Sequence, residues 1–243
     1  MKLAILSDVH ANLEALNATL AEIERQRAEK IFFLGDAVGY GADPNKCVKI
    51  IDKLCDIKLL GNHDYVALGL EDSDNFNPIA KESMRWTQNR IKRKTIETLS
   101  NFDMEATFLD YYFVHGTPDC PSDWNYLLTP DDAKEGFEHF NQQICFVGHS
   151  HLPCVFCLHP DGSVLMTDTI TSFEAKPDCR YIINVGSVGQ PRDGNADACF
   201  VIANTDKNQI DFCRTKYDLE RAQKKLRKAQ LPEFLASRLA NGK

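Results

Sequence analysis

Short apolar runs alternate with amphipathic stretches along the first 60 residues. The apolar runs occupy residues 3–6, 31–34 and 57–60. After the first run, leucine and isoleucine recur at helical spacing up to Ile23, and Asn12 is placed to cap that helix. After the second run, residues 44–55 form another helical pattern, and Pro44 suits its first turn. This alternation predicts a parallel sheet covered by helices.

The rest of the chain is rich in expected strands. Residues 71–104 are polar and are expected to form a helical insertion after Pro78. Apolar runs that predict strands occupy residues 106–109, 111–114, 144–147, 154–158, 164–167, 181–185, 198–203 and 209–214. Only residues 130–140 have helical character among them, which argues against an eightfold βα barrel, since that fold needs a helix after every strand. A basic amphipathic helix is expected at 217–229, with its Lys and Arg side chains facing solvent.

Composition favours a single soluble domain spanning residues 1–243. The chain is 43% hydrophobic and 26% charged, and its net charge of −7 argues against long nucleic acids or anionic membranes as partners. No apolar run approaches the ~18 residues of a membrane-spanning helix. Nine scattered cysteines without an export signal predict reduced thiols and a cytoplasmic location. Cys154 and Cys157 lie in an apolar run, and we expect them to pack in a buried strand.

Five short polar clusters each follow an expected strand. They are Asp8-Val9-His10, Gly35-Asp36, Gly61-Asn62-His63-Asp64, His115-Gly116 and Gly148-His149-Ser150-His151. Because ligands bind at the carboxyl ends of strands in open α/β sheets, we expect the clusters to converge on one pocket. His139 and His159 belong to no cluster, and both are expected to be ordinary surface or loop residues.

The residue types in these clusters predict a metal centre. In extended chain, Asp8 and His10 point the same way, and so do His149 and His151. Imidazole and carboxylate together suit first-row divalent ions, whereas calcium and structural zinc prefer other donors. The predicted ligands are Asp8, His10, Asp36, Asn62, His115, His149 and His151. Seven ligands are about right for two ions, and Asp36 is the expected bridge because a carboxylate has two oxygens.

The ordered pattern D-x-H, G-D, G-N-H-D, H, G-H-x-H resembles that of the calcineurin-like metallophosphoesterases, and in particular their small bacterial phosphodiesterase branch. The resemblance runs from Leu3 to about Ser187 and continues into the segment 186–194. The family often has Asn-Pro-Gly-Ser where this chain has Asn184-Val185-Gly186-Ser187. The resemblance implies an α/β fold, a four-layer α/β/β/α sandwich of two mixed sheets flanked by helices. It also implies metal-dependent hydrolysis of phosphate esters.

The resemblance further implies a role for each site residue. One ion would be held by Asp8, His10, Asp36 and His151, and the other by Asp36, Asn62, His115 and His149. A hydroxide between the two divalent ions would attack phosphorus; Mn is expected, with Fe, Zn, Ni and Co as alternatives. His63 would stabilise the transition state or protonate the leaving oxygen, and Asp64 would orient its ring.

Other residues suggest how a substrate binds. Arg192 is expected to contact a phosphate that is not transferred, and Tyr40 to stack on a base or leaving group. The basic residues of 71–104 would suit a substrate with several phosphates. These features favour a phosphodiesterase acting on a small nucleotide or dinucleoside polyphosphate. A phosphomonoesterase, a protein phosphatase and a non-catalytic metal-binding scaffold stay open as alternatives, as does a homodimer formed through a late edge strand.

Overall fold

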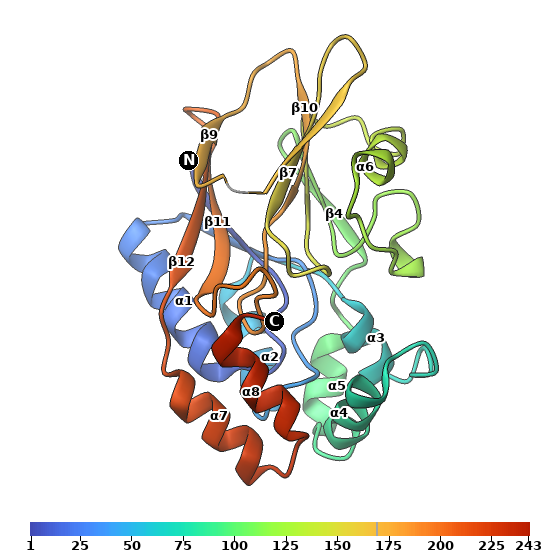
Figure 1. The fold of residues 1–243 in the computed structure, drawn as a ribbon, viewed down its shortest axis with the longest axis vertical. Helices are drawn as coiled ribbons and strands as arrows, with labels where there is room; N and C mark the ends of the chain where they lie inside the picture. The colour runs from blue at the N-terminus through green and yellow to red at the C-terminus, as the bar shows by residue number, and fades with distance from the viewer. Residues whose placement is uncertain (169) are drawn as a thin grey trace.

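The computed structural model describes residues 1–168 and 170–243. Within them the chain forms eight α-helices, one 3₁₀ turn and two six-stranded sheets. Figure 1 shows the two sheets facing each other, with α1 outside one and α6 outside the other. The predicted four-layer α/β/β/α sandwich is thereby confirmed.

The first sheet joins the two ends of the sequence. Its strand order is β3-β2-β1-β11-β12-β9, with β1, β2 and β3 parallel and the other three antiparallel to their neighbours. The strands are β1 (Lys2–Leu6), β2 (Lys30–Phe33), β3 (Ile57–Lys58), β9 (Ser172–Glu174), β11 (Ala198–Asn204) and β12 (Gln209–Thr215). The carboxyl ends of β1, β2 and β3 therefore lie at one edge of the sandwich.

The second sheet is built from the middle of the chain. Its order is β4-β5-β6-β10-β7-β8, with β5, β6 and β10 parallel and the outer strands antiparallel. The strands are β4 (Glu105–Phe108), β5 (Tyr111–Val114), β6 (Ile144–Val147), β7 (Cys154–Leu158), β8 (Val164–Thr167) and β10 (Arg180–Asn184). Both sheets are mixed, as predicted.

Helices cover the outer face of each sheet. They are α1 (Leu13–Gln26), α2 (Pro44–Leu54), α3 (Asn62–Ala67), α4 (Pro78–Gln88), α5 (Arg93–Leu99), α6 (Pro130–Gly136), α7 (Leu219–Lys228) and α8 (Glu233–Asn241), with a 3₁₀ turn at Pro121–Asp123. Helix α1 packs on β11 and β12, while α6 packs on β7 and β8. Among the described residues, no helix is both long enough and apolar enough to cross a membrane.

Alternation of side chains along the strands divides the core between two layers. On β1, Leu3 and Ile5 face the second sheet, whereas Ala4 and Leu6 face the helices. Phe113 and the other apolar residues of the second sheet close the inner layer. Because β1 is buried on both faces, its sequence is a continuous apolar run.

Four elements were not expected from the sequence, namely α3, the 3₁₀ turn at Pro121–Asp123, β9 and α8. Helix α3 is a single short turn of helix whose first residues are polar and buried, so it shows no apolar stripe. The basic C-terminal helix is shorter than predicted, because the Asp218 side chain caps it at Leu219 and the helix stops at Lys228. A separate helix, α8, then follows Pro232.

Candidate metal centre

The predicted ligands come together at the edge where the parallel strands of both sheets end. Asp8 follows β1 and Asp36 follows β2, while His115 follows β5 and His149 follows β6. Each of the seven predicted ligands is at most 7% exposed. The five polar clusters, which are far apart in sequence, thus surround one buried site.

The chain adopts an unusual backbone conformation at most of these positions. The φ angle is 55° at Asp8, 46° at His10, 60° at Asp36, 64° at His149 and 62° at His151. A left-handed conformation costs a residue with a side chain about 1–2 kcal/mol, and such residues gather at functional sites. Main-chain hydrogen bonds hold the turns, including His10 N–H to the carbonyl of Asp36 at 2.9 Å. This conformation turns the side chains inward where each strand ends.

Ring nitrogens and carboxylate oxygens approach one another closely in the centre. Nε2 of His151 lies 3.2 Å from Oδ1 of Asp8, and Nε2 of His115 lies 3.5 Å from Oδ2 of Asp36. Nε2 of His10 lies 3.6 Å from the same Asp36 oxygen. Three groups here have donor atoms close enough to hold an ion: Asp8, His10 and His151; Asp36, His115 and His149; and His10, Asp36 and His63.

Backbone carbonyls orient three of the histidine rings. Nδ1 of His10 donates to the carbonyl of Val38 at 3.0 Å, and Nδ1 of His115 donates to that of Leu34 at 2.8 Å. Nδ1 of His151 donates to the carbonyl of Gln190 at 2.5 Å. With the proton on Nδ1, each ring presents the Nε2 lone pair to the centre, which is the usual arrangement of a metal-binding histidine.

Several buried nitrogen and oxygen atoms that could bind a metal at the centre have no hydrogen-bond partner among the described residues. They are Oδ1 of Asp8, Oδ1 of Asn62, Nε2 of His115 and Nε2 of His149. In addition, Nε2 of His10 and Nε2 of His151 face each other at 3.0 Å, although both carry lone pairs in the tautomers set by their carbonyls. Buried polar atoms are normally paired, so these atoms need a cation between them. The donor set therefore fits a divalent metal.

The electrostatics of the site also favour neutral ligating rings. Burial lowers the pKa of His10 and His151, and it lowers the pKa of His149 to about 3. Burial alone would lower the pKa of His115 as well, but the Asp36 carboxylate, whose Oδ2 lies 3.5 Å from Nε2, outweighs it and raises that pKa to about 9. Without metal, a proton on His115 is the cation beside the carboxylates, and a bound metal would take its place.

Asp64 holds the backbone around the centre. One of its carboxylate oxygens accepts the N–H groups of Ala37 at 3.1 Å and Gly61 at 3.3 Å, and the other accepts that of Val38 at 3.1 Å. Among the described residues, both oxygens bind main chain and no hydrogen bond joins them to the His63 ring, whose Nδ1 faces Met84. Burial, helped by the nearby Asp36 charge, raises the pKa of Asp64 to about 7.

His63 lies beside the centre among aromatic and sulfur groups. Its Nδ1 lies 3.2 Å from Sδ of Met84, and its ring packs 4.7 Å from Phe76 and 4.5 Å from Tyr40, measured between centroids. Burial lowers the pKa of His63 to about 4. Because Nδ1 faces Met84, Nε2 is the ring nitrogen left to meet a substrate.

An open cavity of about 550 Å³ lies over the centre and is lined by both predicted substrate residues. The Tyr40 ring is 8% exposed and packs edge-on against His10 at 4.7 Å, so most of it is covered. Arg192 is less buried, and its Nε has no partner among the described residues. Its Nη2 donates to Oε1 of Gln190 at 3.1 Å. Arg192 thus has an N–H group free to donate a hydrogen bond at the cavity, whereas Tyr40 mainly forms part of the cavity wall.

The other walls of the cavity were not predicted from the sequence. Asn75, Phe76 and Asn77 come from the segment 71–104, and Tyr126 comes from the loop before α6. The Tyr126 ring stacks on His149 with centroids 4.2 Å apart. The exposed basic residues of 71–104 do not line this cavity, so the predicted polyphosphate-binding role of those cations is not supported.

The end of β10 and the segment after it support two of the ligand loops, a role that was not predicted from the sequence. Nδ2 of Asn184 donates to the carbonyl of Gly148 at 2.6 Å and to Oγ of Ser150 at 2.9 Å. Oγ of Ser187 donates to the carbonyl of Asp8 at 2.9 Å. The Asn-x-Gly-Ser pattern in this segment was the available signal, since short polar side chains commonly bond to nearby loop backbone.

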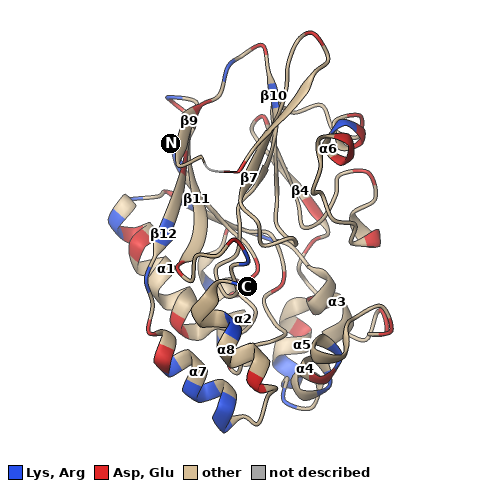
Figure 2. Cartoon of the chain, viewed as in Figure 1, with Lys and Arg blue, Asp and Glu red and all other residues tan. Residues whose placement is uncertain are grey.

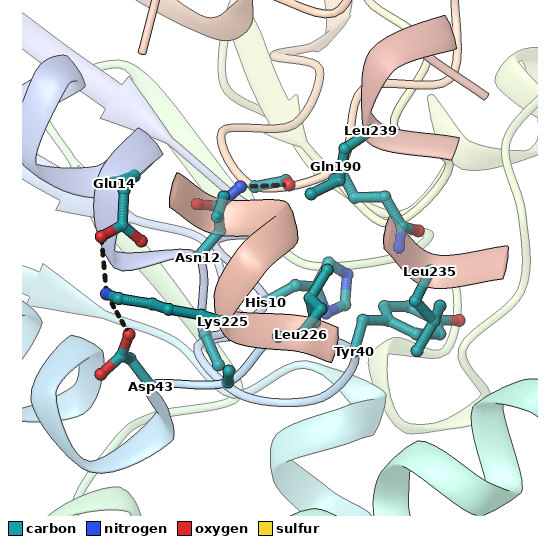
Figure 3. Close-up of a pocket in the computed structure, with 15 residues that line it drawn as sticks. His10, Asn12, Glu14, Tyr40, Asp43, Gln190, Lys225, Leu226, Leu235 and Leu239 are labelled. Carbon is teal, nitrogen blue, oxygen red and sulfur yellow. Dashed lines mark hydrogen bonds and ion pairs between the residues drawn. The ribbon is translucent and has the colours of Figure 1, made fainter. Parts of the chain in front are cut away.

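The C-terminal helices close the site behind His10. Figure 3 shows Lys225 of α7 placed between Glu14 and Asp43, with its Nζ 2.6 Å from Oε1 of Glu14. Leucines of α7 and α8 close over Tyr40 in the same view. Lys225 therefore differs from the predicted solvent-facing row, because two buried carboxylates draw it inward. The row's other cations, Arg221, Lys224, Arg227 and Lys228, are exposed, and Figure 2 shows cations along α7.

The chain is similar to known proteins in both sequence and fold. The profile of the calcineurin-like phosphoesterase superfamily domain matches residues 1–208. An uncharacterized protein of Methanocaldococcus jannaschii is 39% identical over 245 residues, which cover 99% of this chain and 98% of that protein. A metallophosphoesterase crystal structure from Sphaerobacter thermophilus has a TM-score of 0.87 and 36% identity, covering 100% and 99% of the two chains. A hypothetical protein from Pyrococcus horikoshii shares the fold, with a TM-score of 0.77, 18% identity and coverage of 100% and 98%.

Proposed function

Because the chain belongs to the calcineurin-like phosphoesterase superfamily and is a metal-dependent hydrolase, we propose that it cleaves phosphodiester bonds with two divalent ions. The single observation that carries this proposal is the set of buried donor atoms without partners at the strand ends. Two of the three clusters that could hold an ion share no residue, which supports two separate positions. Mn²⁺ is the proposed ion in both positions.

Asp8, His10 and His151 are the proposed ligands of one ion, and Asn62, His115 and His149 those of the other, with Asp36 between them. Two such ions supply charge neutralisation for the attacking and leaving oxygens of an in-line displacement. The chain's own contribution is to hold the rings by their Nδ1 atoms and to keep the centre buried. Asp64 supports the site indirectly by binding the backbone that carries Asp36.

His63 is proposed to place a proton on the leaving oxygen through Nε2. The ring lines the cavity, and Met84 occupies the side of Nδ1. Burial keeps the free ring neutral, but the negative charge of a bound phosphate favours protonation at Nε2. His63 is thus proposed as an acid that charges only when the substrate is present.

A small nucleotide is the proposed substrate, with a dinucleoside polyphosphate as the extended form. Arg192 is the only Lys or Arg among the described residues that line the cavity, so it can bind one phosphate outside the metal centre. Phe76 and Tyr126 offer aromatic surface for a base, and Asn75 and Asn77 offer polar contacts. A phosphomonoester without an aromatic group, or a phosphoserine in a protein, would use the metals equally but would leave the aromatic walls unused.

We also propose that the whole chain is one catalytic domain in which residues 71–104 form a helical insertion. Phe76 and Met84 of this segment contact His63, and Oγ of Ser83 accepts the N–H of Tyr40 at 2.6 Å. The proposed location is the cytoplasm, supported by nine free thiols.

The test is hydrolysis of bis-p-nitrophenyl phosphate and p-nitrophenyl phosphate by metal-stripped protein, with and without Mn²⁺. We expect metal-dependent turnover with preference for the diester. Replacing His63 by alanine should lower kcat by about 10²–10⁴-fold while both metals stay bound. Asp36→Asn should remove activity together with metal. A protein that binds two ions but turns over neither these esters nor a panel of nucleotides would instead be a scaffold.

A further inference from the structure

Three potential metal ligands lie together at the opposite end of the second sheet. Cys157 is in β7, His159 follows that strand, and Cys179 precedes β10. β10 then runs toward Asn184, which contacts the metal-centre loop at Gly148. The cluster is therefore separated from the metal centre by the length of β10.

Strand register brings these side chains onto one face. β7 and β10 are antiparallel, with Cys157 opposite Tyr181 and Leu158 opposite Arg180. Continuing this register places His159 opposite Cys179. Because side chains alternate along a strand, all four of Cys157, His159, Cys179 and Tyr181 share a face. Strand pairing therefore places these side chains together.

The distances fit a tetrahedral ion. The ligand atoms of Cys157, His159 and Cys179 all lie within 4.8 Å of one another, and Sγ of Cys179 is 3.8 Å from Nδ1 of His159. A zinc ion with ordinary bond lengths separates a sulfur and a nitrogen ligand by about 3.6 Å. Oδ1 of Asp178 lies 3.9 Å from the Cys179 sulfur but is not one of the three grouped donors, so water or a turned Asp178 side chain would supply the fourth ligand.

The donor atoms distinguish this cluster from the metal centre. The centre offers imidazole, carboxylate and amide, whereas two of the three donors here are sulfur, which selects a softer ion such as Zn²⁺. Cys179 belongs to the core between the sheets and Cys157 packs against it, but apolar packing does not account for the partly buried imidazole of His159 beside both sulfurs. Burial and the neighbouring Cys179 raise the pKa of Cys157 to about 11, so an arriving ion must displace a proton.

We propose that Cys157, His159 and Cys179 bind a Zn²⁺ ion, with Asp178 or water as the fourth ligand. The ion ties the end of the β7–β8 hairpin to the segment that enters β10. Since β7 and β10 both lead to the metal-centre loops, this second site stabilises the sheet that carries His149 and His151. The proposal does not depend on the identity of the substrate.

Cobalt substitution tests the site in the full-length protein. Thiolate-bound Co²⁺ gives an intense near-ultraviolet charge-transfer band, which the sulfur-free metal centre cannot produce. We expect this band in the wild-type protein and its loss in Cys157→Ser/Cys179→Ser. Cys213→Ser is the matched control, because Cys213 is a partly buried cysteine on β12 outside the cluster, and it should keep the band. Bound Zn²⁺ should fall by one ion per chain in the double variant, with bis-p-nitrophenyl phosphate turnover retained.

A second variant covers the case in which the double serine variant does not fold. His159→Gln removes a single ligand outside the strand, so circular dichroism should be unchanged while the cobalt band weakens and shifts. The proposal is overturned if the wild-type protein shows no thiolate band. It is also overturned if Cys157 and Cys179 are joined by a disulfide in protein purified under reducing conditions, as read by mass spectrometry.

Discussion

Replacing Gly61 with alanine tests whether the position of Asp36 controls catalysis. A Cβ at residue 61 would lie 2.1 Å from Oδ1 of Asp36 and 2.6 Å from its backbone nitrogen. Ordinary contacts begin near 3.4 Å, and part of the obstacle is backbone, so the carboxylate must move. The same oxygen accepts the N–H of His63 at 2.9 Å. One methyl group therefore displaces the proposed bridge and loosens the backbone of His63.

The size of the effect follows from the displacement. Restoring a normal contact requires the Asp36 oxygen to move by about 1 Å, and a shift of this size at a reacting centre costs on the order of 100-fold in rate. We expect kcat to fall by about that factor. Metal content should also fall, because the shifted carboxylate can no longer reach both groups of histidines.

The assay compares kcat for bis-p-nitrophenyl phosphate, bound metal and the circular dichroism spectrum. Gly136→Ala is the matched control, since its Cβ would lie 3.2 Å from the mobile end of the Ile182 side chain, in α6 and away from the centre. That variant should keep wild-type kcat. If Gly61→Ala retained full kcat and both ions, the assignment of Asp36 as the bridge would be refuted.

Three further predictions concern substrate, stability and metal. Arg192→Ala should raise KM by about 10-fold or more with little change in kcat, as expected for loss of a charged hydrogen bond to a non-reacting phosphate; an unchanged KM would remove Arg192 from the binding site. Lys225→Met should lower the free energy of unfolding by about 2 kcal/mol at neutral pH, between the values for exposed and buried ion pairs. Burial raises the pKa of Asp43, whereas the hydrogen bond from Lys225 lowers it, and the resulting pKa is below 3.8. The ion pair therefore stabilises the fold above pH 3.8, and this stabilisation is lost as the pH falls through the lowered pKa of Asp43. Urea unfolding should show the stabilities of the wild-type and Lys225→Met proteins converging in acid. Chelation should lower the free energy of unfolding by about 3 kcal/mol for each ion removed, relative to protein with metal at 100 times Kd, read as a lower Tm; an unchanged Tm would argue against ions in the buried centre.

The fold was largely predictable because buried strands can be recognised in a sequence as apolar runs. β1, β2, β6 and β11 are covered on both faces, so each appears as an uninterrupted apolar run. Elements held by tertiary contact left no such pattern. Helix α8 packs through Leu235, Ala236 and Leu239 with weak contrast between its faces. β9 is only three residues long and pairs with the edge of β12.

The candidate ligands could be predicted from the sequence for a different reason: each belongs to a polar cluster that directly follows an expected strand. Strand ends of parallel sheets converge by topology, so a polar residue such as Asp8 or His115 is placed by the fold itself. The cavity wall is set differently. Phe76 and Tyr126 line the cavity from loops. The conformation of these loops depends on tertiary packing, which cannot be predicted from the local sequence. Asp64 shows the same limit, because its proximity to His63 in sequence suggested a contact that three backbone N–H groups occupy instead.

Sequence spacing also did not reveal the Cys157–His159–Cys179 cluster. The C-x-x-C spacing drew attention to Cys154 and Cys157, but Cys154 points to the opposite face of β7 from Cys157 and is buried in the core beside α6. The partners of Cys157 come instead from residues 159 and 179, one from the same strand face and one from the antiparallel neighbour. A metal site formed across a β-ladder has ligand spacings fixed by register, not by a short motif. Sites of this kind become visible only when the pairing of the strands is known.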